Sequence, residues 1–471
     1  MNFYLRSLSS IVFFLGLPFM LLAQQQPFLG YLGVDLSKGG VQSDLSDLQP
    51  YKNMKIGGHH VTITSLPKGL INRPDLGIIL PGFVKDVKCI HRFPQPDTLL
   101  GNIRPADGSK GKSPPVAYVD CPRICITPQG DYLLSVIAGK YHYGGTDPHY
   151  KVNDILLYRS KDKGRNWQGP FLSTSISYNQ HAWVPLVPKG SARIYTFSTE
   201  PAPGDFDGRE NAGIGFRYSD DDGVTWSGVH RISPVNDPGF QGMFCIRATE
   251  SSKGTWFIAP HTGAWDHGKV ITHLYILRST DQGKTWQLIP GKRSNGWQWA
   301  PAQRMDEGRP LAMNNGNILL FARTEEGHLW LLRSHDDGLT WSSPEPTPLV
   351  HPDAPPMIAL LSDKKTIIAL IHNRNSGGAF NKEDRSELWI SLSKDQGKSW
   401  TEPRFLASTS TATTRPIFGS IQYCMTYCDI LADHGIVNIF IPHLWRQVLQ
   451  IRIPERDLLK LPTKADLFGR S

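Results

Sequence analysis

One short motif recurs five times along the chain and constrains its fold more than any other feature. The motif reads Ser-x-Asp-x-Gly-x-(Thr, Ser or Asn)-Trp, and its copies begin at Ser160, Ser219, Ser279, Ser334 and Ser393. Successive copies start 59, 60, 55 and 59 residues apart, a spacing too regular for chance. A near-constant period is typical of a fold that stacks repeated supersecondary units. We therefore expect the repeats to form one large domain.

Each copy has the chemistry of a hairpin turn, because Asp accepts backbone N–H bonds and Gly tolerates a positive φ. An apolar, β-rich run precedes every copy, as in Ile155–Arg159, and a further turn and strand lie upstream of each run. The unit is therefore predicted to be a four-stranded antiparallel meander. Six units over residues 118–455 predict an all-β, six-bladed β-propeller. The sixth unit stops after its third strand, so its fourth strand should come from upstream of Arg123.

The two ends of the chain differ from the repeats. Arg6 followed by the apolar run Ile11–Leu22 is typical of a secretory signal peptide, with a short membrane anchor as the alternative. No later stretch is long and apolar enough to predict a spanning helix. We predict a signal peptide, an extension that partly wraps the propeller, the propeller itself and a tail, at residues 1–23, 24–115, 116–455 and 456–471.

The charge of the chain and its distribution limit the kinds of binding partner that we expect. The chain carries 50 Lys and Arg against 42 Asp and Glu, giving a net charge of +8. These basic residues are dispersed, which argues against nucleic acid as a partner. We expect an exported, periplasmic or extracellular monomer without a stable membrane span.

Six cysteines occur, and two pairs share a four-residue spacing, Cys121/Cys125 and Cys424/Cys428. The simplest interpretation is that these are small buried side chains. A disulfide between the pairs, or a metal site, remains an alternative.

The five repeats resemble the Asp boxes of the sialidase (neuraminidase) superfamily, also called BNR repeats. In a meander the boxes lie on the turns between third and fourth strands, so we assign them a structural role. A pocket should lie on the opposite face, at the starts of the first strands and at the loops between second and third strands. The resemblance covers residues of about 118–453.

Three arginines match the family pattern on that face. Arg123 stands in a segment similar to the Arg-Ile-Pro motif, with Cys125 in place of the proline. Arg323 ends a second strand, and Arg385 precedes a third strand. The resemblance implies that the three bind a substrate carboxylate, for which forked guanidinium groups are well suited.

The resemblance also implies the reacting groups. Tyr427 resembles the nucleophile, with Tyr423 as its rival, and Glu307 resembles the carboxylate that activates it. Asp147 resembles the acid/base, and His149 and Asp154 compete for that role. A neutral phenol suits a substrate with a carboxylate on its anomeric carbon, and sialidases use Tyr where most glycosidases use a carboxylate.

Other aromatic side chains lie in the same loops. Several histidines occur there, and Trp183, Trp265 and Trp299 are candidates for a sugar-stacking wall or for core packing. The resemblance implies a retaining exo-α-sialidase that needs neither a cofactor nor a metal and acts on a glycan with a terminal acidic sugar. The alternatives are a propeller exo-glycosidase for another sugar and a non-catalytic glycan-binding propeller.

Overall fold

The computed structural model describes most of the region that carries the repeats. The described residues are 48–92, 117–140, 153–176, 183–200, 211–243, 246–266, 269–301, 303–376, 382–414 and 424–469. The expected signal peptide, Asp147, His149 and Tyr423 lie outside them. Within them, no helix has the length and apolar character needed to cross a membrane.

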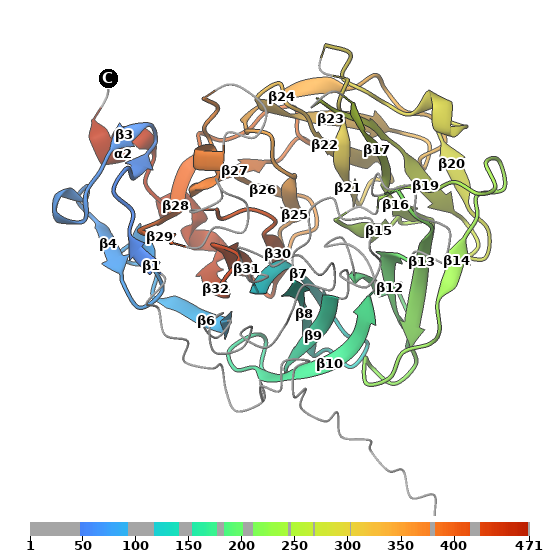
Figure 1. Cartoon of the computed structure of the whole chain (residues 1–471), viewed down its shortest axis with the longest axis horizontal. Helices are drawn as coiled ribbons and strands as arrows, with labels where there is room; N and C mark the ends of the chain where they lie inside the picture. The colour runs from blue at the N-terminus through green and yellow to red at the C-terminus, as the bar shows by residue number, and fades with distance from the viewer. Residues whose placement is uncertain are drawn as a thin grey trace, which may run out of the picture.

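Six antiparallel sheets form the blades of a β-propeller, as predicted, and Figure 1 looks down their ring. Blade 1 contains β7 (Ala117–Ile126), β8 (Tyr132–Lys140), β9 (Asn153–Ser160) and β10 (Gln168–Ile176). Blade 2 contains β11 (Val184–Leu186), β12 (Ile194–Thr199), β13 (Ile214–Ser219) and β14 (His230–Ile232). Blade 3 contains β15 (Ala248–Glu250), β16 (Trp256–Ile258), β19 (Ile276–Ser279) and β20 (Gln287–Ile289).

The other three blades follow the same order from the inside outward. Blade 4 contains β21 (Asp306–Ala312), β22 (Ile318–Arg323), β23 (His328–Ser334) and β24 (Glu345–Val350). Blade 5 contains β25 (Met357–Leu360), β26 (Ile367–Ile371), β27 (Glu387–Ser393) and β28 (Arg404–Thr409). Blade 6 contains β30 (Asp429–Asp433), β31 (Ile436–His443), β32 (Gln447–Pro454) and β6 (Asp86–Arg92). The first strands of neighbouring blades touch in a closed ring, from β7 through β30 and back.

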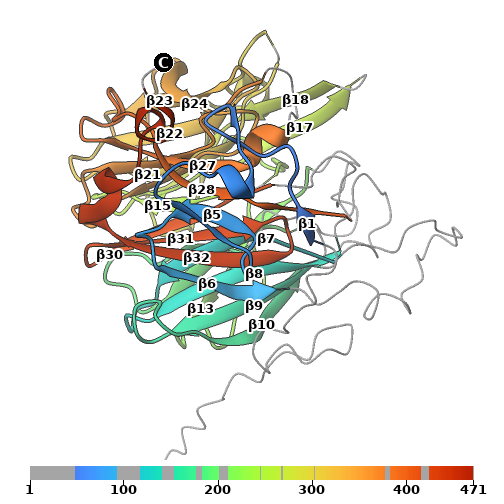
Figure 2. The ribbon, with the colours of Figure 1, turned by 90° about the vertical axis from the view of Figure 1, so that its left-hand side faces the viewer.

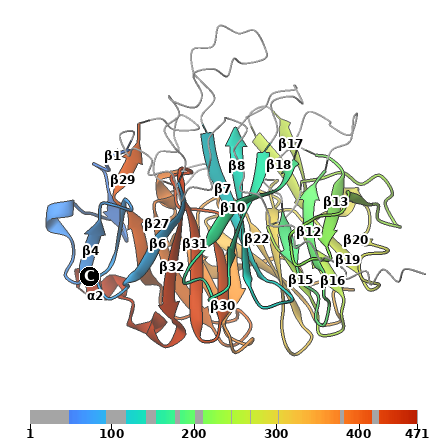
Figure 3. The same ribbon diagram turned by 90° about the horizontal axis from the view of Figure 1, so that it is seen from below.

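The ring closes with a strand from the other end of the chain. β6 pairs with β32 in antiparallel register, so an upstream strand completes blade 6, as the missing sixth repeat predicted. Figures 2 and 3 show β6 beside β32. β5 (Ile78–Pro81) and β4 (Leu70–Arg73) also extend blade 5 beyond β28. The sequence assigned residues 24–115 to an extension that partly wraps the propeller and foresaw only the closing strand; β4 and β5 instead join blade 5, because the edge of its sheet gains a pairing partner from them.

Short two-stranded ribbons and short helices lie outside the six blades. Two-stranded ribbons join β1 (Leu48–Pro50) to β29 (Thr411–Thr413), β2 (Lys55–Ile56) to β3 (His59–His60), and β17 (His261–Asp266) to β18 (Lys269–Leu274). The short helices are η1 (Ile63–Ser65), η3 (Arg293–Asn295), η4 (Lys382–Arg385), η5 (Glu455–Lys460) and α2 (Lys464–Phe468). Phe468 of α2 stacks on His59, so the C-terminal tail packs on the N-terminal segment, as Figure 1 shows for α2 and β3.

All five Asp boxes adopt one turn. In each, the Gly N–H donates to the Ser Oγ four residues earlier at 2.7–2.9 Å. The Asp carboxylate accepts the N–H of the residue before Trp at 2.8–2.9 Å. The Gly and the residue before it both have positive φ in every copy, which is the hairpin geometry that the sequence predicted.

The boxes also connect the blades. In blades 1, 3 and 4 an Arg ends the third strand just before the box Ser and reaches the box of the following blade. The bonds run from Arg159 to Asp222, from Arg278 to Asp337 and from Arg333 to Gln396. Arg452 of blade 6 reaches the Lys163 carbonyl at 3.4 Å, across the closure of the ring. Bonds from these arginines thus join blades 1 and 2, 3 and 4, 4 and 5, and 6 and 1 on the box face.

Candidate active site

Tyr427, Glu307 and Arg323 form one hydrogen-bonded group, although 120 residues separate Tyr427 from Glu307. The Tyr427 hydroxyl donates to Glu307 Oε1 at 2.6 Å. Arg323 Nη1 donates to Glu307 Oε2 at 2.6 Å and lies 3.4 Å from the Tyr427 hydroxyl. The three side chains are almost fully buried, with 5%, 3% and 5% of Tyr427, Glu307 and Arg323 exposed. The structure therefore brings together three of the six residues that the sequence singled out.

The backbone within or just before the innermost strands has an unusual conformation at four residues. Cys121, Trp183, Glu307 and Tyr427 have φ of 45°, 55°, 46° and 63°. Bulky residues rarely adopt a positive φ, and strained residues of this kind cluster at functional sites. The register shifts in β7 between Asp120 and Arg123, and in β21 between Asp306 and Arg309. These irregularities re-aim side chains where the strands begin.

Gly308 allows the tight path after Glu307. A Cβ at position 308 would lie 2.7 Å from Leu274 Cδ1 and 2.9 Å from Ala259 Cβ. Any other residue would push these two apolar neighbours apart. The Glu307-Gly308 pair is therefore needed to place the carboxylate at the start of β21.

The electrostatics of the group couple its members. Burial raises the pKa of Tyr427 well above its ordinary value, and the Glu307 carboxylate raises it further, while Arg323 and Arg385 oppose the shift. Burial alone would lower the pKa of Arg323, but the carboxylates of Asp353, Glu307 and Asp306 hold it well above its ordinary value. At neutral pH the phenol is thus protonated and the guanidinium is charged.

Arg385, which precedes β27 of blade 5, lies near Tyr427, Glu307 and Arg323. It ends η4, is buried, and its Nη2 donates to the backbone carbonyl of Asp353. Its charge acts on both Tyr427 and Asp353.

Arg123 lies in β7 of blade 1 and is also buried. Its charge helps to lower the pKa of Asp429, two residues after Tyr427. Arg123 thus lies near the Tyr427 segment, and the meeting of all three guanidinium groups on one substrate group stays a prediction.

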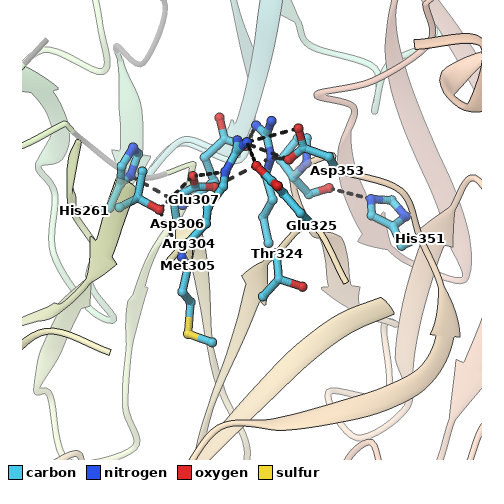
Figure 4. Close-up of polar contacts among 12 residues, drawn as sticks. His261, Arg304, Met305, Asp306, Glu307, Thr324, Glu325, His351 and Asp353 are labelled. Atoms are coloured by element: carbon cyan, nitrogen blue, oxygen red, sulfur yellow. Dashed lines mark hydrogen bonds and ion pairs between the residues drawn. The ribbon is translucent and has the colours of Figure 1, made fainter. Parts of the chain in front are cut away.

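A network of ion pairs supports Arg323, and the sequence analysis did not single out its other members. Arg304 lies between three carboxylates, those of Asp306, Glu325 and Asp353, as Figure 4 shows. Arg323 Nε donates to Asp353 Oδ1 at 2.6 Å. Asp306 could have been expected near the site, because it is adjacent to Glu307 in the sequence.

A second buried cluster centres on Asp429. Its carboxylate accepts from Arg309 Nη2 at 2.7 Å, Arg247 Nη1 at 2.8 Å and the Ile124 N–H at 3.0 Å. Although burial would raise the pKa of Asp429, Arg247, Arg309 and Arg123 lower it. This carboxylate, two residues after Tyr427, ties blades 1, 4 and 6 together.

The remaining candidates have different outcomes. Asp154 lies in β9, paired with Ser175 and Ala138. Trp183 is buried and packs edge-on against Trp226, so it belongs to the core rather than to an exposed sugar-binding wall. His261 lies beside the group, because the Glu307 N–H points to its Nδ1 at 3.4 Å. Of Asp147 and its rivals for the acid/base role, the structure describes only the strand position of Asp154.

The cysteines Cys89, Cys121, Cys125, Cys424 and Cys428 are not joined by disulfides in the structure. All but Cys89 are buried. This agrees with the interpretation of the spaced pairs as small buried side chains.

The fold and the Asp boxes define a BNR propeller of the sialidase superfamily. A model of the BNR repeat-like domain matches residues 148–439, well over half of the chain, and the chain belongs to that family.

Solved structures agree on the fold. The NanB sialidase of Streptococcus pneumoniae matches with a TM-score of 0.53 and 14% identity, over 72% of this chain and 69% of that one. A protein of unknown function from Dyadobacter fermentans matches with a TM-score of 0.51 and 15% identity, over 72% and 95%.

Proposed function

We propose that the protein is a retaining exo-α-sialidase-type glycoside hydrolase that releases a terminal acidic sugar from a glycan. The observation that carries the proposal is the buried 2.6 Å hydrogen bond from the Tyr427 hydroxyl to Glu307. A buried tyrosine with a dedicated carboxylate partner is the arrangement that a phenolic nucleophile needs.

The chemistry follows from this contact. A tyrosine has an ordinary pKa near 10, and burial raises that of Tyr427, so the phenol needs a base in contact with it. Glu307 accepts the proton as the phenolic oxygen bonds to the anomeric carbon and the bond to the leaving oxygen breaks. Arg323 stabilises the negative charge that passes between the phenol and the carboxylate. Water then releases the sugar, and two displacements retain its configuration.

The proton for the leaving oxygen requires an acid, and we propose Asp147 for it. The same residue would activate the water in the second displacement, as microscopic reversibility requires. His149 and Asp154 remain the other candidates.

Arg123, Arg323 and Arg385 are proposed to bind the substrate carboxylate. Arg323 and Arg385 both act on Tyr427, so an anion that they bind would lie close to the nucleophile. Forked guanidinium groups recognise a carboxylate better than Lys does. No cofactor enters this mechanism.

A second candidate is an exo-glycosidase for another sugar. Arg323 already pairs with Glu307 and Asp353, and these carboxylates offset much of its charge. A site in which Arg323 only supports Glu307 would not require an acidic substrate.

The proposal includes the setting in which the enzyme works. Residues 1–23 are proposed to direct export, and the dispersed basic residues of the chain favour a glycan over nucleic acid as the partner. We expect a monomer, which sedimentation of the purified protein would test.

The experiment compares two Tyr→Phe variants in an assay of a fluorogenic sialoside. Tyr427→Phe should lower kcat roughly 10³-fold or more, because the nucleophile is lost. Tyr132→Phe is the matched control, since its hydroxyl also donates to a carboxylate at 2.6 Å but lies at the start of β8. It should change kcat less than about threefold. A screen of monosaccharides released from mixed glycans identifies the sugar if the sialoside is not cleaved, and binding without turnover would contradict the proposal.

A further inference from the structure

Asp353 lies in the connection from β24 of blade 4 to β25 of blade 5. The whole segment from 351 to 356 is buried, and three of its six residues are proline. Proline fixes φ and restricts the residue before it, so this connection has little freedom. His351 further fixes it, because its N–H donates to the Gly327 carbonyl at 2.8 Å and its Nε2 lies 3.1 Å from the Pro355 carbonyl. Asp353 is thus held on a rigid segment at the edge of the site.

Asp353 contacts both Arg323 and Arg385, through different groups. Its Oδ1 accepts from Arg323 Nε at 2.6 Å, and its backbone carbonyl accepts from Arg385 Nη2. Arg304 approaches the same carboxylate, with Nη2 at 3.1 Å from Oδ1 and Nη1 at 3.2 Å from Oδ2. Figure 4 shows Asp353 and Glu325 near Arg304.

The contact with Asp353 also fixes the orientation of the Arg323 guanidinium group. Nε and Nη1 lie on different edges of one guanidinium plane, and they bind Asp353 and Glu307 respectively. Two carboxylates on two edges determine the orientation of a planar group. Arg323 therefore cannot turn toward or away from Tyr427 without losing one of them.

Asp353 is ionised whenever the protein is folded at ordinary pH. Burial would raise its pKa, but Arg323, Arg304 and Arg385 hold that pKa far below its ordinary range. The pairing with Arg323 is therefore present at every pH at which an enzyme assay is run.

We infer that Asp353 is a positioning residue that sets Arg323 and Arg385 relative to one another, and so fixes the anion-binding side of the site. This inference rests on the proposed function, in which these two arginines bind the substrate carboxylate. It adds a residue from the rigid connection between blades 4 and 5 to a site otherwise built from strand ends.

The test compares Asp353→Asn with Glu325→Gln. Both variants remove one negative charge from Arg304, but within the part of the chain that the structure describes Glu325 bonds to Arg304 and not to Arg323 or Arg385. Asp353→Asn should raise KM for a sialoside roughly ten- to a hundredfold with a smaller change in kcat, since misplaced binding groups weaken substrate binding. Glu325→Gln should change KM less than about threefold. Equal effects of the two variants would overturn the inference.

Crystal structures of both variants provide a readout that needs no substrate. The guanidinium group of Arg323 should move in Asp353→Asn and stay in place in Glu325→Gln, whereas Arg385, which bonds to the backbone carbonyl of residue 353, should stay in both. An unmoved Arg323 in Asp353→Asn would overturn the inference. If the wild-type protein neither cleaves nor binds a sialoside, the proposed function fails, and this comparison alone decides the inference.

Loss of one partner from a buried ion pair can also prevent folding. In that case the double variant Asp353→Asn with Arg304→Gln restores the charge balance. It should fold and keep the raised KM and the displaced Arg323. A normal KM in the double variant would contradict the inference.

Discussion

The two faces of the propeller differ in how their hydrogen-bonded polar residues are arranged along the chain. On the box face, Asp, Ser and Gly bond within eight consecutive residues, and five copies repeat the same distances. On the site face, Tyr427, Glu307 and Arg323 come from two blades and occur once. The comparison teaches that repetition marks what holds this fold together, whereas the candidate chemistry lies where the repeat is broken.

The backbone shows the same contrast. In each box turn a positive φ falls on the Gly, which has no Cβ and adopts that conformation readily, together with the residue before it. On the site face a positive φ falls on Glu307 and Tyr427, and this backbone conformation is energetically unfavourable for both residues. The stabilising bonds of the box turns and the strain at Glu307 and Tyr427 lie on opposite faces of the propeller.

The largest expected effect is on the site face. Glu307→Gln should lower kcat roughly 10²- to 10⁴-fold, because an amide keeps the shape of the side chain but cannot accept the phenolic proton. Glu345→Gln is the control, since Glu345 is an exposed partner of Arg333 in β24. Steady-state kinetics on the released sugar measure both. A Glu307→Gln enzyme with wild-type kcat would contradict the assignment of catalysis to the site face.

A smaller effect is expected on the box face, and on stability rather than on activity. Asp395→Ala should lower the free energy of unfolding by about 1–3 kcal/mol, because the side chain accepts the Lys398 and Ser399 N–H groups and the Ser399 hydroxyl. Urea denaturation measures the change, with the exposed Lys394→Ala as control. The kcat of Asp395→Ala should stay within about twofold of wild type, and a large fall in kcat would contradict the separation of the faces.

The smallest effect concerns the pH dependence of that stability. Partial burial would raise the pKa of Asp395, but hydrogen bonds from Ser399 and Lys398 lower it to about 2. Because the folded-state pKa lies below the unfolded value, this stabilisation is complete above about pH 4 and is lost as the pH falls toward 2. The difference in unfolding free energy between wild type and Asp395→Ala should therefore shrink over that interval. A difference that stays constant from pH 6 to pH 2.5 would contradict this assignment.

The features of the fold that could be predicted from the sequence are those set by residues close together in the chain or by the repeat. The turn geometry of the boxes, the six blades and an upstream closing strand follow from a motif, a period and a missing sixth copy. Which upstream residues form the closing strand β6, and that β4 and β5 join blade 5, is shown only by their pairing with distant sheet edges.

The candidate site was predictable only in part. The resemblance to the sialidase family placed Arg323, Glu307 and Tyr427 on one face, and the structure joins them by hydrogen bonds. Asp353 gave no comparable signal, because it matters through contacts with Arg304 and Arg323 that fold topology creates. The positive φ of Glu307 and Tyr427 is likewise invisible in the sequence, since neither residue type favours it.

The most direct test of the account identifies the residue that carries the sugar during turnover. The protein is treated with a fluorinated sialic acid that slows release of the glycosyl-enzyme, then digested and analysed by mass spectrometry. We predict one sugar adduct, on the peptide that contains Tyr427, and none in Tyr427→Phe. An adduct on a carboxylate, or one that forms equally in Tyr427→Phe, would contradict the claim that Glu307 prepares Tyr427 as the nucleophile.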